Sequence, residues 1–307
     1  MGKLAFVFPG QGAQQPGMGQ ALYEASREAR ELMDRAEALM PGLLDSCFHG
    51  PMARLTRTDI AQPALFVLEA ALAKMAVQAG IRPGAVAGFS LGEWPACHCA
   101  GMMDFDEGFG LVKRRGEWMQ ACAEEIPGGM AAVLRLTADE VREKLREHPE
   151  VQAVNLNAPG QTVVAGPIPA LEAFEESLKA QGGRSLRLNV AGAFHSPLMA
   201  SASEKMAQAL EEVNISPPQL MVYSNLTARP YQESAAKDWL ARQLASPVKW
   251  EETIRNLAEA GFDTFLELGP GKVLCGLIGK ILPGAVTLQA EDMAGIAQAA
   301  LTLGGKA

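Results

Sequence analysis

Ser90 lies in the pentapeptide GFSLG at residues 88–92, which has the spacing G-x-S-x-G. A short apolar strand is predicted just before this serine and a helix from about Leu91, and a nucleophilic serine occupies this strand–turn–helix context. Glycine on both sides lets the backbone crowd at the turn, and the following helix N-terminus presents free N–H groups to an oxyanion. The pattern indicates acyl transfer on Ser90; an inert serine in a glycine-rich turn is the alternative.

A nucleophilic serine requires a base, and the chain has four histidines. His98 lies on the helix after Ser90, about 12 Å along its axis at 1.5 Å per residue, which is too far to take the serine proton. His148 lies in a charged run and His49 in a loop, both typical of solvated positions. Elimination favours His195, which lies at a predicted domain junction, where sites are common. A helix-capping or core histidine is the other interpretation.

Arg115 is the one charged residue on an otherwise apolar helix face. On a helix predicted over Glu107–Cys122, Arg115 shares its face with Leu111, Trp118, Met119 and Cys122. A buried guanidinium without a partner is costly. Its partner is therefore either a carboxylate of the protein, for which Glu93 is a candidate, or a carboxylate of the substrate, which the guanidinium would bind through two hydrogen bonds.

Two glycine-rich segments resemble nucleotide-binding loops but lack the required spacing. After the apolar strand at Leu4–Phe8, a G-x-G-x-x-G motif would require glycine at position 15, where Gln15 stands. The segment GPGK at 269–272 lacks the glycine spacing and the hydroxyl residue of a P-loop. We interpret the first as a loop that approaches a ligand closely and the second as a strand-to-helix turn.

Composition and charge exclude several classes of protein. The 307 residues are 48% hydrophobic and 20% charged, which is typical of a globular protein. The net charge of −8 argues against a general nucleic-acid binder, because the surface as a whole would repel phosphates. The five cysteines have no framework spacing and are expected to be reduced. Cys97 and Cys99 point to different faces of a helix, so no metal site is expected there.

No membrane segment is expected. The N-terminal apolar run Leu4–Phe8 is too short for a signal peptide or a membrane span. The longest apolar stretch, Ala64 to Val77, contains Glu69 and Lys74 and is predicted to be a packed helix. The protein is therefore expected to be cytoplasmic.

The elements that must position these residues alternate between strand and helix, which favours an α/β fold with a parallel sheet. Between 127 and 190 the order changes to β-α-β-β-α-β, the ferredoxin-like pattern. We therefore predict a large domain formed by 1–126 and 191–307 with a small domain, 127–190, inserted into it. The predicted strands are Leu4–Phe8, Ala85–Gly88, Met130–Leu136, Val151–Leu156, Thr162–Ala165, Ser185–Val190, Met221–Ser224 and Thr264–Leu268. The predicted helices include Pro63–Val77, Glu107–Cys122, a helix opened by the capping box TADE at 137–140, Leu171–Ala180, Ala236–Leu244 and Trp250–Ala260.

Six motifs resemble, in this order, those of the malonyl-CoA:acyl carrier protein transacylases. They are FPGQG at 8–12, GFSLGE at 88–93, RG at 115–116 with MQ at 119–120, NAPGQ at 157–161, AFHS at 193–196 and ELGPG at 267–271. The resemblance runs nearly end to end. It implies an α/β-hydrolase-like large domain with a ferredoxin-like insertion. It also implies transfer of a malonyl group from CoA to the phosphopantetheine thiol of acyl carrier protein, with CoA thioester as substrate and no further cofactor.

The resemblance also implies roles for individual residues. Ser90 would be the nucleophile and His195 the base, and the backbone N–H groups of Gln11 and Leu91 would form the oxyanion hole. Arg115 would bind the free malonyl carboxylate.

Further positions in the resemblance concern orientation and selectivity. Gln243, rather than an acid, would orient the catalytic histidine, and Phe194 matches the malonyl-selective pattern. Gln62 and Met119 would line the acyl pocket, and Asn157 would lie on the cleft side of the small domain.

One position departs from the family pattern. The family commonly has histidine before the nucleophile, and Phe89 stands there in this chain. The substitution removes a polar partner next to the acyl site, and its effect on acyl selectivity and rate stays open.

Two other functions remain candidates at this stage. Water could replace the carrier thiol, which would make the protein a thioester hydrolase that uses the same Ser90 and His195; retention of Arg115 argues against this. A non-catalytic subunit is the third interpretation. Because carrier proteins are acidic, docking is expected to use a local basic patch, with Arg184, Arg187, Lys249 and Lys272 as candidates. The sequence leaves open whether the carrier serves fatty-acid, polyketide or malonate-decarboxylase metabolism.

Overall fold

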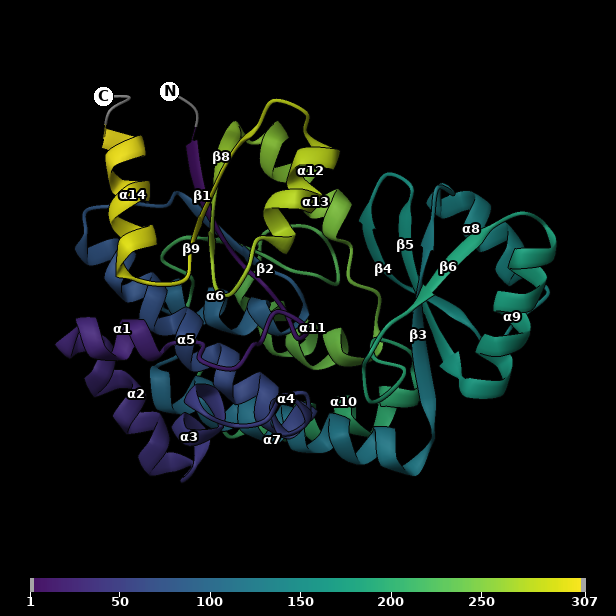
Figure 1. Cartoon of the computed structure of the whole chain (residues 1–307), viewed down its shortest axis with the longest axis horizontal. Coiled ribbons are helices and arrows are strands. Elements are labelled where there is room, and N and C mark those ends of the chain that lie inside the picture. The colour runs from purple at the N-terminus through teal and green to yellow at the C-terminus, as the bar shows by residue number, and fades with distance from the viewer. Residues whose placement is uncertain (1–2, 305–307) are drawn as a thin grey trace.

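Two β-sheets organise the chain, and they lie in different parts of the molecule (Figure 1). The computed structural model describes residues 3–304. The strands of the first sheet are β1 (Lys3–Phe8), β2 (Ala85–Gly88), β7 (Met221–Tyr223), β8 (Phe262–Leu268) and β9 (Val286–Ala290). The strands of the second are β3 (Gly128–Leu134), β4 (Gln152–Ala158), β5 (Gln161–Pro167) and β6 (Arg184–Arg187). The first sheet is parallel in the order β7-β2-β1-β8-β9, and the second is antiparallel in the order β4-β5-β3-β6. The predicted fold class, an α/β-hydrolase-like domain with a ferredoxin-like insertion, is confirmed.

Helices flank both sheets. Those before the second sheet are α1 (Gln20–Ala25), α2 (Arg27–Leu39), α3 (Leu43–Phe48), α4 (Met52–Leu55), α5 (Thr58–Gln78), α6 (Glu93–Cys99) and α7 (Phe105–Glu125). Those after it are α10 (Ala200–Glu211), α11 (Ala236–Arg242), α12 (Trp250–Glu259), α13 (Val273–Ile281) and α14 (Met293–Gly304). Between the strands of the second sheet lie α8 (Ala138–Leu145) and α9 (Ile168–Ala180). Short 3-10 helices occur at Ser90–Gly92, Pro197–Met199, Glu233–Ala235 and Gln243–Ala245.

Alternating side chains of β1 show how the first sheet is buried on both faces. Phe6 and Phe8 pack into the larger core, which includes side chains of α5, α6 and α7. Ala5 and Val7 point the other way, into a core shared with α12 and α13. Because both faces are covered, the strands consist of continuous apolar residues, as expected of a parallel sheet.

Helix α5 begins earlier than the sequence indicates. The helix was expected to start at Pro63, but Pro63 lies inside a helix that begins at Thr58. The side chain of Gln120 on α7 accepts a hydrogen bond from the N–H of Thr58, which anchors the additional turn. This contact between distant residues offsets the local cost of proline in a helix.

Among the described helices, α5 alone is long and apolar enough to cross a membrane, and 83% of its apolar window is buried inside the protein. Its length and composition are thus accounted for by its place in the core.

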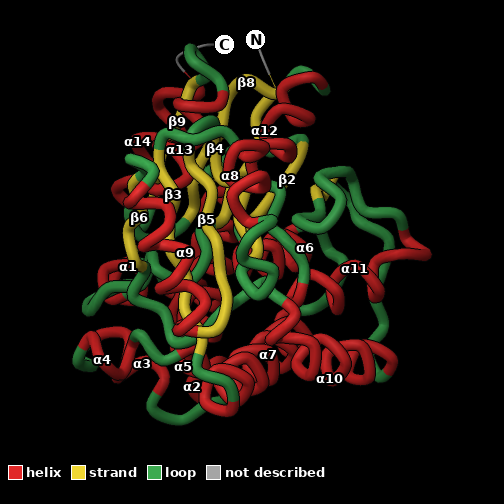
Figure 2. The backbone as a smooth tube through the Cα atoms, turned by 90° about the vertical axis from the view of Figure 1, so that its right-hand side faces the viewer, coloured by secondary structure: helices red, strands yellow, loops and turns green. Residues whose placement is uncertain are grey.

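The second sheet has the predicted β-α-β-β-α-β order, from β3 through α8, β4, β5 and α9 to β6. One face, with Ala131, Val133 and Val164, packs against α8 and α9. The other face, with Ala132 and Val163, belongs to the core of the larger part. Figure 2 shows α8 and α9 in front of β3–β6, with α7 and α10 side by side beneath. The domain boundaries at 126/127 and 190/191 stay a prediction.

The carboxyl ends of three neighbouring strands meet at one edge of the first sheet. Phe8 at the end of β1 pairs with Gly88 at the end of β2, and Val7 pairs with Glu267 of β8. Loops that follow these strands therefore lie together, at the edge where open α/β sheets bind ligands. The helices between residues 20 and 55, strand β9 and helix α14 were not predicted from the sequence.

Candidate active site

Ser90 occupies a sharp turn between β2 and α6. Its φ is 54°, in the left-handed region that non-glycine residues rarely adopt. The glycines on either side are required by close approach: a Cβ on Gly88 would lie 1.8 Å from the carbonyl carbon of Gly92, and a Cβ on Gly92 would lie 2.1 Å from the carbonyl oxygen of Phe8. The G-x-S-x-G spacing therefore has a steric cause in this fold.

His195 is the histidine that reaches Ser90. Its Nε2 lies 2.7 Å from Ser90 Oγ, and its Nδ1 lies 2.9 Å from the backbone carbonyl oxygen of Gln243. A carbonyl oxygen only accepts hydrogen bonds, so Nδ1 carries the ring proton and Nε2 is free to accept the serine proton. The backbone carbonyl of Gln243 thus fixes the imidazole ring, and the catalytic role that the resemblance implies for Gln243 stays a prediction. His195 also has a positive φ, 61°.

The surroundings of His195 keep its imidazole neutral. The side chain is buried, and burial, followed by the positive charge of Arg115, lowers the pKa of His195 to about 4. At neutral pH the ring is therefore an unprotonated base.

Arg115 is fully buried beside Ser90. Its Nη1 donates to Gln62 Oε1 at 2.7 Å, and its Nη2 donates to Gln243 Oε1 at 3.0 Å and lies 3.4 Å from Ser90 Oγ. Burial lowers the pKa of Arg115 to about 9, and Glu93 partly opposes this change, so the side chain stays charged at neutral pH.

The hydrogen-bond partners of Arg115 within the protein are neutral. Across residues 3–304 Arg115 has no ion pair with a carboxylate, and its Nε donates no hydrogen bond. The sequence left Glu93 and a substrate carboxylate as alternatives. The structure places amide oxygens around the guanidinium, which leaves its charge without a direct anionic partner.

A cavity of about 70 Å³ adjoins Ser90 and His195. Of the residues implied by the resemblance, Gln11, Gln62, Met119 and Phe194 line it. Asn157 does not: it lies on β4 and lines a second, larger cavity of about 230 Å³. Leu91, Arg115 and Gln243 are buried and are not among the lining residues.

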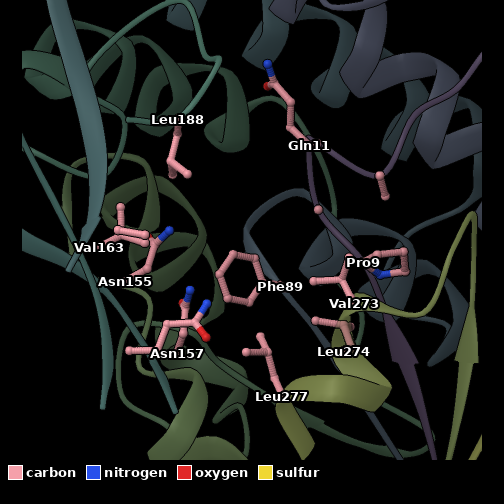
Figure 3. A pocket seen from close by; sticks show the side chains of 15 residues that line it. Pro9, Gln11, Phe89, Asn155, Asn157, Val163, Leu188, Val273, Leu274 and Leu277 are labelled. Carbon is pink, nitrogen blue, oxygen red and sulfur yellow. The ribbon is translucent and has the colours of Figure 1, made fainter. Parts of the chain in front are cut away.

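The larger cavity lies between the two sheets and adjoins the smaller one, because Gln11, Phe89, Asn155 and Leu188 line both. In Figure 3 the ring of Phe89 lies between two walls. One wall carries Asn155 and Asn157 of β4, and the other carries Val273, Leu274 and Leu277 of α13. The side chains of Asn155 and Asn157 line this cavity, and their Oδ1 atoms are buried without a hydrogen-bond partner in the described chain.

The ring of Phe89 contacts an aromatic side chain of α12. It packs edge-on against Trp250 of α12, with ring centroids 5.6 Å apart. The backbone carbonyl of Phe89 lies against Gly10, where a Cβ would come within 2.5 Å of it. The residue before the nucleophile thus presents an apolar ring where the two cavities adjoin.

Two backbone N–H groups near Ser90 remain free. Within the described chain, neither the N–H of Gln11 nor that of Leu91 donates a hydrogen bond. Both residues border the serine: Gln11 lines its cavity, and Leu91 follows it at the start of the turn toward α6. Such groups can stabilise an oxyanion.

The sequence analysis missed Asn225. Its Oδ1 accepts from the N–H of Ser90 at 2.7 Å, and its Nδ2 donates to the carbonyl of Gly88 at 2.6 Å. Asn225 thereby holds both ends of the turn from the end of β7. A polar residue directly after a strand was the signal that could have revealed it.

A serine bonded to a neutral histidine, at the carboxyl edge of a parallel sheet and beside free N–H groups, defines the class of serine-dependent α/β acyl-transfer proteins. Comparison with known proteins gives the same class: residues 5–297 match the family described as "Acyl transferase domain".

Individual relatives narrow this class. The chain is 40% identical over 310 residues to the malonyl CoA-acyl carrier protein transacylase of Bacillus subtilis, covering 99% of this chain and 98% of the relative. The solved malonyl CoA-acyl carrier protein transacylase of Clostridium perfringens is similar with a TM-score of 0.94 and 35% identity, covering 99% of this chain and 98% of that one. A solved complex, described as "type II PKS acyl-carrier protein in complex with its malonyl-transacylase", contains a chain that is similar with a TM-score of 0.93 and 34% identity, covering 98% of this chain and 99% of that one. The chain belongs to the acyl transferase domain family and, within it, to the malonyl-CoA:acyl carrier protein transacylases.

Proposed function

We propose that this protein transfers a malonyl group from CoA to the phosphopantetheine thiol of an acyl carrier protein through an ester on Ser90. One observation carries the proposal: the Ser90 hydroxyl lies 2.7 Å from a neutral histidine and 3.4 Å from a buried guanidinium without an anionic partner. The first contact supports acyl transfer, and the second supports an acyl group with a free carboxylate.

The first half-reaction loads the enzyme. His195 Nε2 takes the proton of Ser90 Oγ while the oxygen bonds to the thioester carbon. The N–H groups of Gln11 and Leu91 donate to the resulting oxyanion, and each such donor contributes about 3 kcal/mol to transition-state stabilisation. When the carbon–sulfur bond breaks, the proton passes from His195 to the CoA sulfur.

The second half-reaction repeats these steps with the carrier thiol as the nucleophile. His195 takes the thiol proton, the sulfur attacks the ester carbon, and the proton then returns to Ser90 Oγ. The larger cavity fits the pantetheine arm, because its mostly apolar walls also carry the side-chain amides of Asn155 and Asn157, which can bond to the amides of the arm.

Each step is balanced by the CoA thioester, the carrier thiol and the residues named, so we expect no additional cofactor. All five cysteines are free thiols, which is consistent with the reducing cytoplasm as the compartment of the enzyme. Hydrolysis by the same pair is less compatible with Arg115, since a simple acyl group offers nothing for a buried cation to bind.

The mass of the acyl-enzyme after mixing with malonyl-CoA or acetyl-CoA tests the proposal. We expect a malonyl ester on the wild type that disappears when carrier protein is added, and no ester on Ser90→Ala. In Arg115→Ala, malonyl loading is expected to fall about 100-fold, because charge-assisted hydrogen bonds are lost, while acetyl loading changes far less.

Equal losses of malonyl and acetyl loading in Arg115→Ala would contradict the role of the guanidinium. Release of free malonate at the same rate with and without carrier protein would identify a hydrolase instead.

A further inference from the structure

Glu93 is a buried carboxylate at the centre of the active-site hydrogen bonds. It lies in the first turn of α6, is 0% exposed, and accepts three hydrogen bonds. The donors are the backbone N–H of Asn225 at 3.1 Å, the hydroxyl of Tyr231, and Nε2 of Gln243 at 2.7 Å. The mechanism above assigns no step to this side chain.

The contact with Glu93 decides which way the amide of Gln243 points. Gln243 Nε2 donates both to Glu93 Oε2 and to the backbone carbonyl of Ser90, each at 2.7 Å. Because both partners are acceptors, the nitrogen must face them and Oε1 must face the opposite way. That oxygen accepts from Nη2 of Arg115 at 3.0 Å.

Glu93 therefore acts on Arg115 without touching it. The carboxylate orients the amide, and the amide holds the guanidinium next to Ser90. A direct ion pair between Glu93 and Arg115 would occupy the donors that a substrate carboxylate needs. An intervening neutral amide fixes the arginine and leaves its charge free.

We infer that Glu93 is a positioning residue that, through the side-chain amide of Gln243, fixes Arg115 for the free carboxylate of the acyl group and so makes loading of Ser90 selective for such groups. The inference rests on the function proposed above and adds a specificity-determining residue to it.

Glu93→Gln is the sharpest variant, because it keeps the shape of the side chain. The backbone N–H of Asn225 cannot invert, so the oxygen of the new amide must face it and the new NH₂ group must face Gln243. Two NH₂ groups would then oppose each other, so Gln243 Nε2 loses its acceptor on Glu93 and the amide is expected to shift away from its place. A displaced amide holds Arg115 Nη2 less firmly, because Gln243 Oε1 is the acceptor that positions this nitrogen.

The experiment compares single-turnover loading of Ser90 from malonyl-CoA and acetyl-CoA by acyl-enzyme mass. A disturbance of Ser90 itself lowers both rates, so the ratio of the two rates reports on Arg115. For Glu93→Gln we expect the malonyl-to-acetyl ratio to fall about 10- to 100-fold, the size expected when a hydrogen bond to a charged group is lost. Labelling of Ser90 by phenylmethanesulfonyl fluoride, a neutral reagent, shows that the variant is folded.

Tyr231→Phe is the matched control. It also removes one donor to Glu93, but the N–H of Asn225 still holds Oε1 and the contact with Gln243 is unchanged. We expect its malonyl-to-acetyl ratio to stay within about threefold of the wild type, since loss of one hydrogen bond outside the relay leaves Gln243 in place.

Two results would overturn the inference. One is equal loss of malonyl and acetyl loading in Glu93→Gln, which would make Glu93 a structural residue only. The other is an equal fall of the ratio in both variants. If the wild type labels with the sulfonyl fluoride but does not load malonyl, the proposed function fails first and the inference falls with it.

Discussion

At the scale of single residues, Ser90 and His195 share an uncommon backbone conformation. Their φ values of 54° and 61° place both in the left-handed region, which costs a residue with a side chain about 1–2 kcal/mol. Specific bonds offset this cost: Asn225 binds the N–H of Ser90, and the carbonyl of Gln243 binds His195 Nδ1. The strain aims both side chains at one point, where Oγ and Nε2 meet.

The charge next to His195 makes a prediction about pH. Arg115 contributes to the low pKa of His195, about 4, because a nearby cation disfavours a protonated ring. In Arg115→Met this cation is gone and the pKa of His195 is expected to rise. The rate of Ser90 labelling by phenylmethanesulfonyl fluoride should therefore fall at a higher pH in the variant than in the wild type, as pH is lowered from 8 toward 4.

The sign of this change is the informative part. An acid limb at the same pH in both proteins, or at a lower pH in Arg115→Met, would show that Arg115 does not influence the base. The pH profiles of the wild type and the variant can be compared directly, because the labelling reagent has no carboxylate that Arg115 would bind.

At the scale of elements, the packing of α7 against α5 sets the position of Arg115. The next residue on α7, Gly116, lies against the backbone of α5: a Cβ there would be 2.8 Å from the carbonyl oxygen of Thr58 and 3.1 Å from the Cα of Asp59. The glycine lets the two helices approach closely enough for Nη1 of Arg115 to reach Gln62 on α5. The two residues of the RG motif thus act together: Arg115 supplies the charge, and Gly116 allows the close helix packing that places it.

Gly116→Ala is expected to destabilise the protein by about 1–3 kcal/mol, because the added methyl group meets backbone atoms that cannot rotate away. Gly110→Ala on the same helix is the matched control. A Cβ at Gly110 has no atom within 4 Å, so this variant is expected to gain about 0.5–1 kcal/mol from helix propensity. Urea unfolding of the two variants measures the difference.

If both variants change the free energy of unfolding in the same direction, the close approach of α7 to α5 does not require glycine at position 116. Malonyl loading provides a second measure, since only Gly116→Ala is expected to displace Arg115.

At the scale of the whole molecule, the site lies between the two sheets. The first sheet contributes the loops after β1 and β2, and the second contributes Asn155, Asn157 and Val163 on the opposite wall of the larger cavity. A carrier that inserts its pantetheine arm here must contact residues near the mouth, including exposed Val273 and the adjacent Lys272.

Of the four basic residues expected to dock the carrier, Arg187 is already paired with Glu175, and Lys249 is half-buried. Arg184 and Lys272 remain exposed.

Lys272→Glu is expected to slow malonyl transfer from loaded enzyme to carrier by about 3- to 10-fold at low salt, because it weakens attraction to an acidic partner. Transfer to free pantetheine, which carries no protein charge, should change little. Lys205→Glu on α10, distant from α13 in both Figures 1 and 2, makes the same charge change and serves as the control.

Raised salt should reduce the difference between wild type and Lys272→Glu, since ions screen exposed charges. Transfer that ignores salt, or an equal loss in Lys205→Glu, would count against docking at this mouth.

Much of this architecture was predictable because it depends on short-range patterns. The parallel α/β arrangement follows from alternating strand and helix signals, and the capping box at 137–140 appears as predicted, with Thr137 and Glu140 bonded reciprocally. The placement of Ser90 in a strand-to-helix turn follows from the glycines at 88 and 92. His195 and Arg115 could be selected by elimination and by the helical period, and the structure places both beside Ser90.

Other features depend on contacts between residues far apart in the sequence, which the spacing of residue types does not reveal. Helix α5 passes through Pro63 because Gln120, distant in the chain, binds its first turn. The edge strand β9 pairs with β8 only in the assembled sheet. The motifs of the sequence likewise give no sign that Glu93 binds Gln243 and not Arg115.

The sequence by itself determined the local elements, the residue types available for acyl transfer and the family, because helix and strand periods and glycine turns act over a few residues. Only the tertiary structure decided how the side chains of Ser90, His195 and Arg115 meet, and that an amide separates Glu93 from Arg115. These choices depend on hydrogen bonds between residues more than 100 positions apart, and such bonds form only when the chain packs.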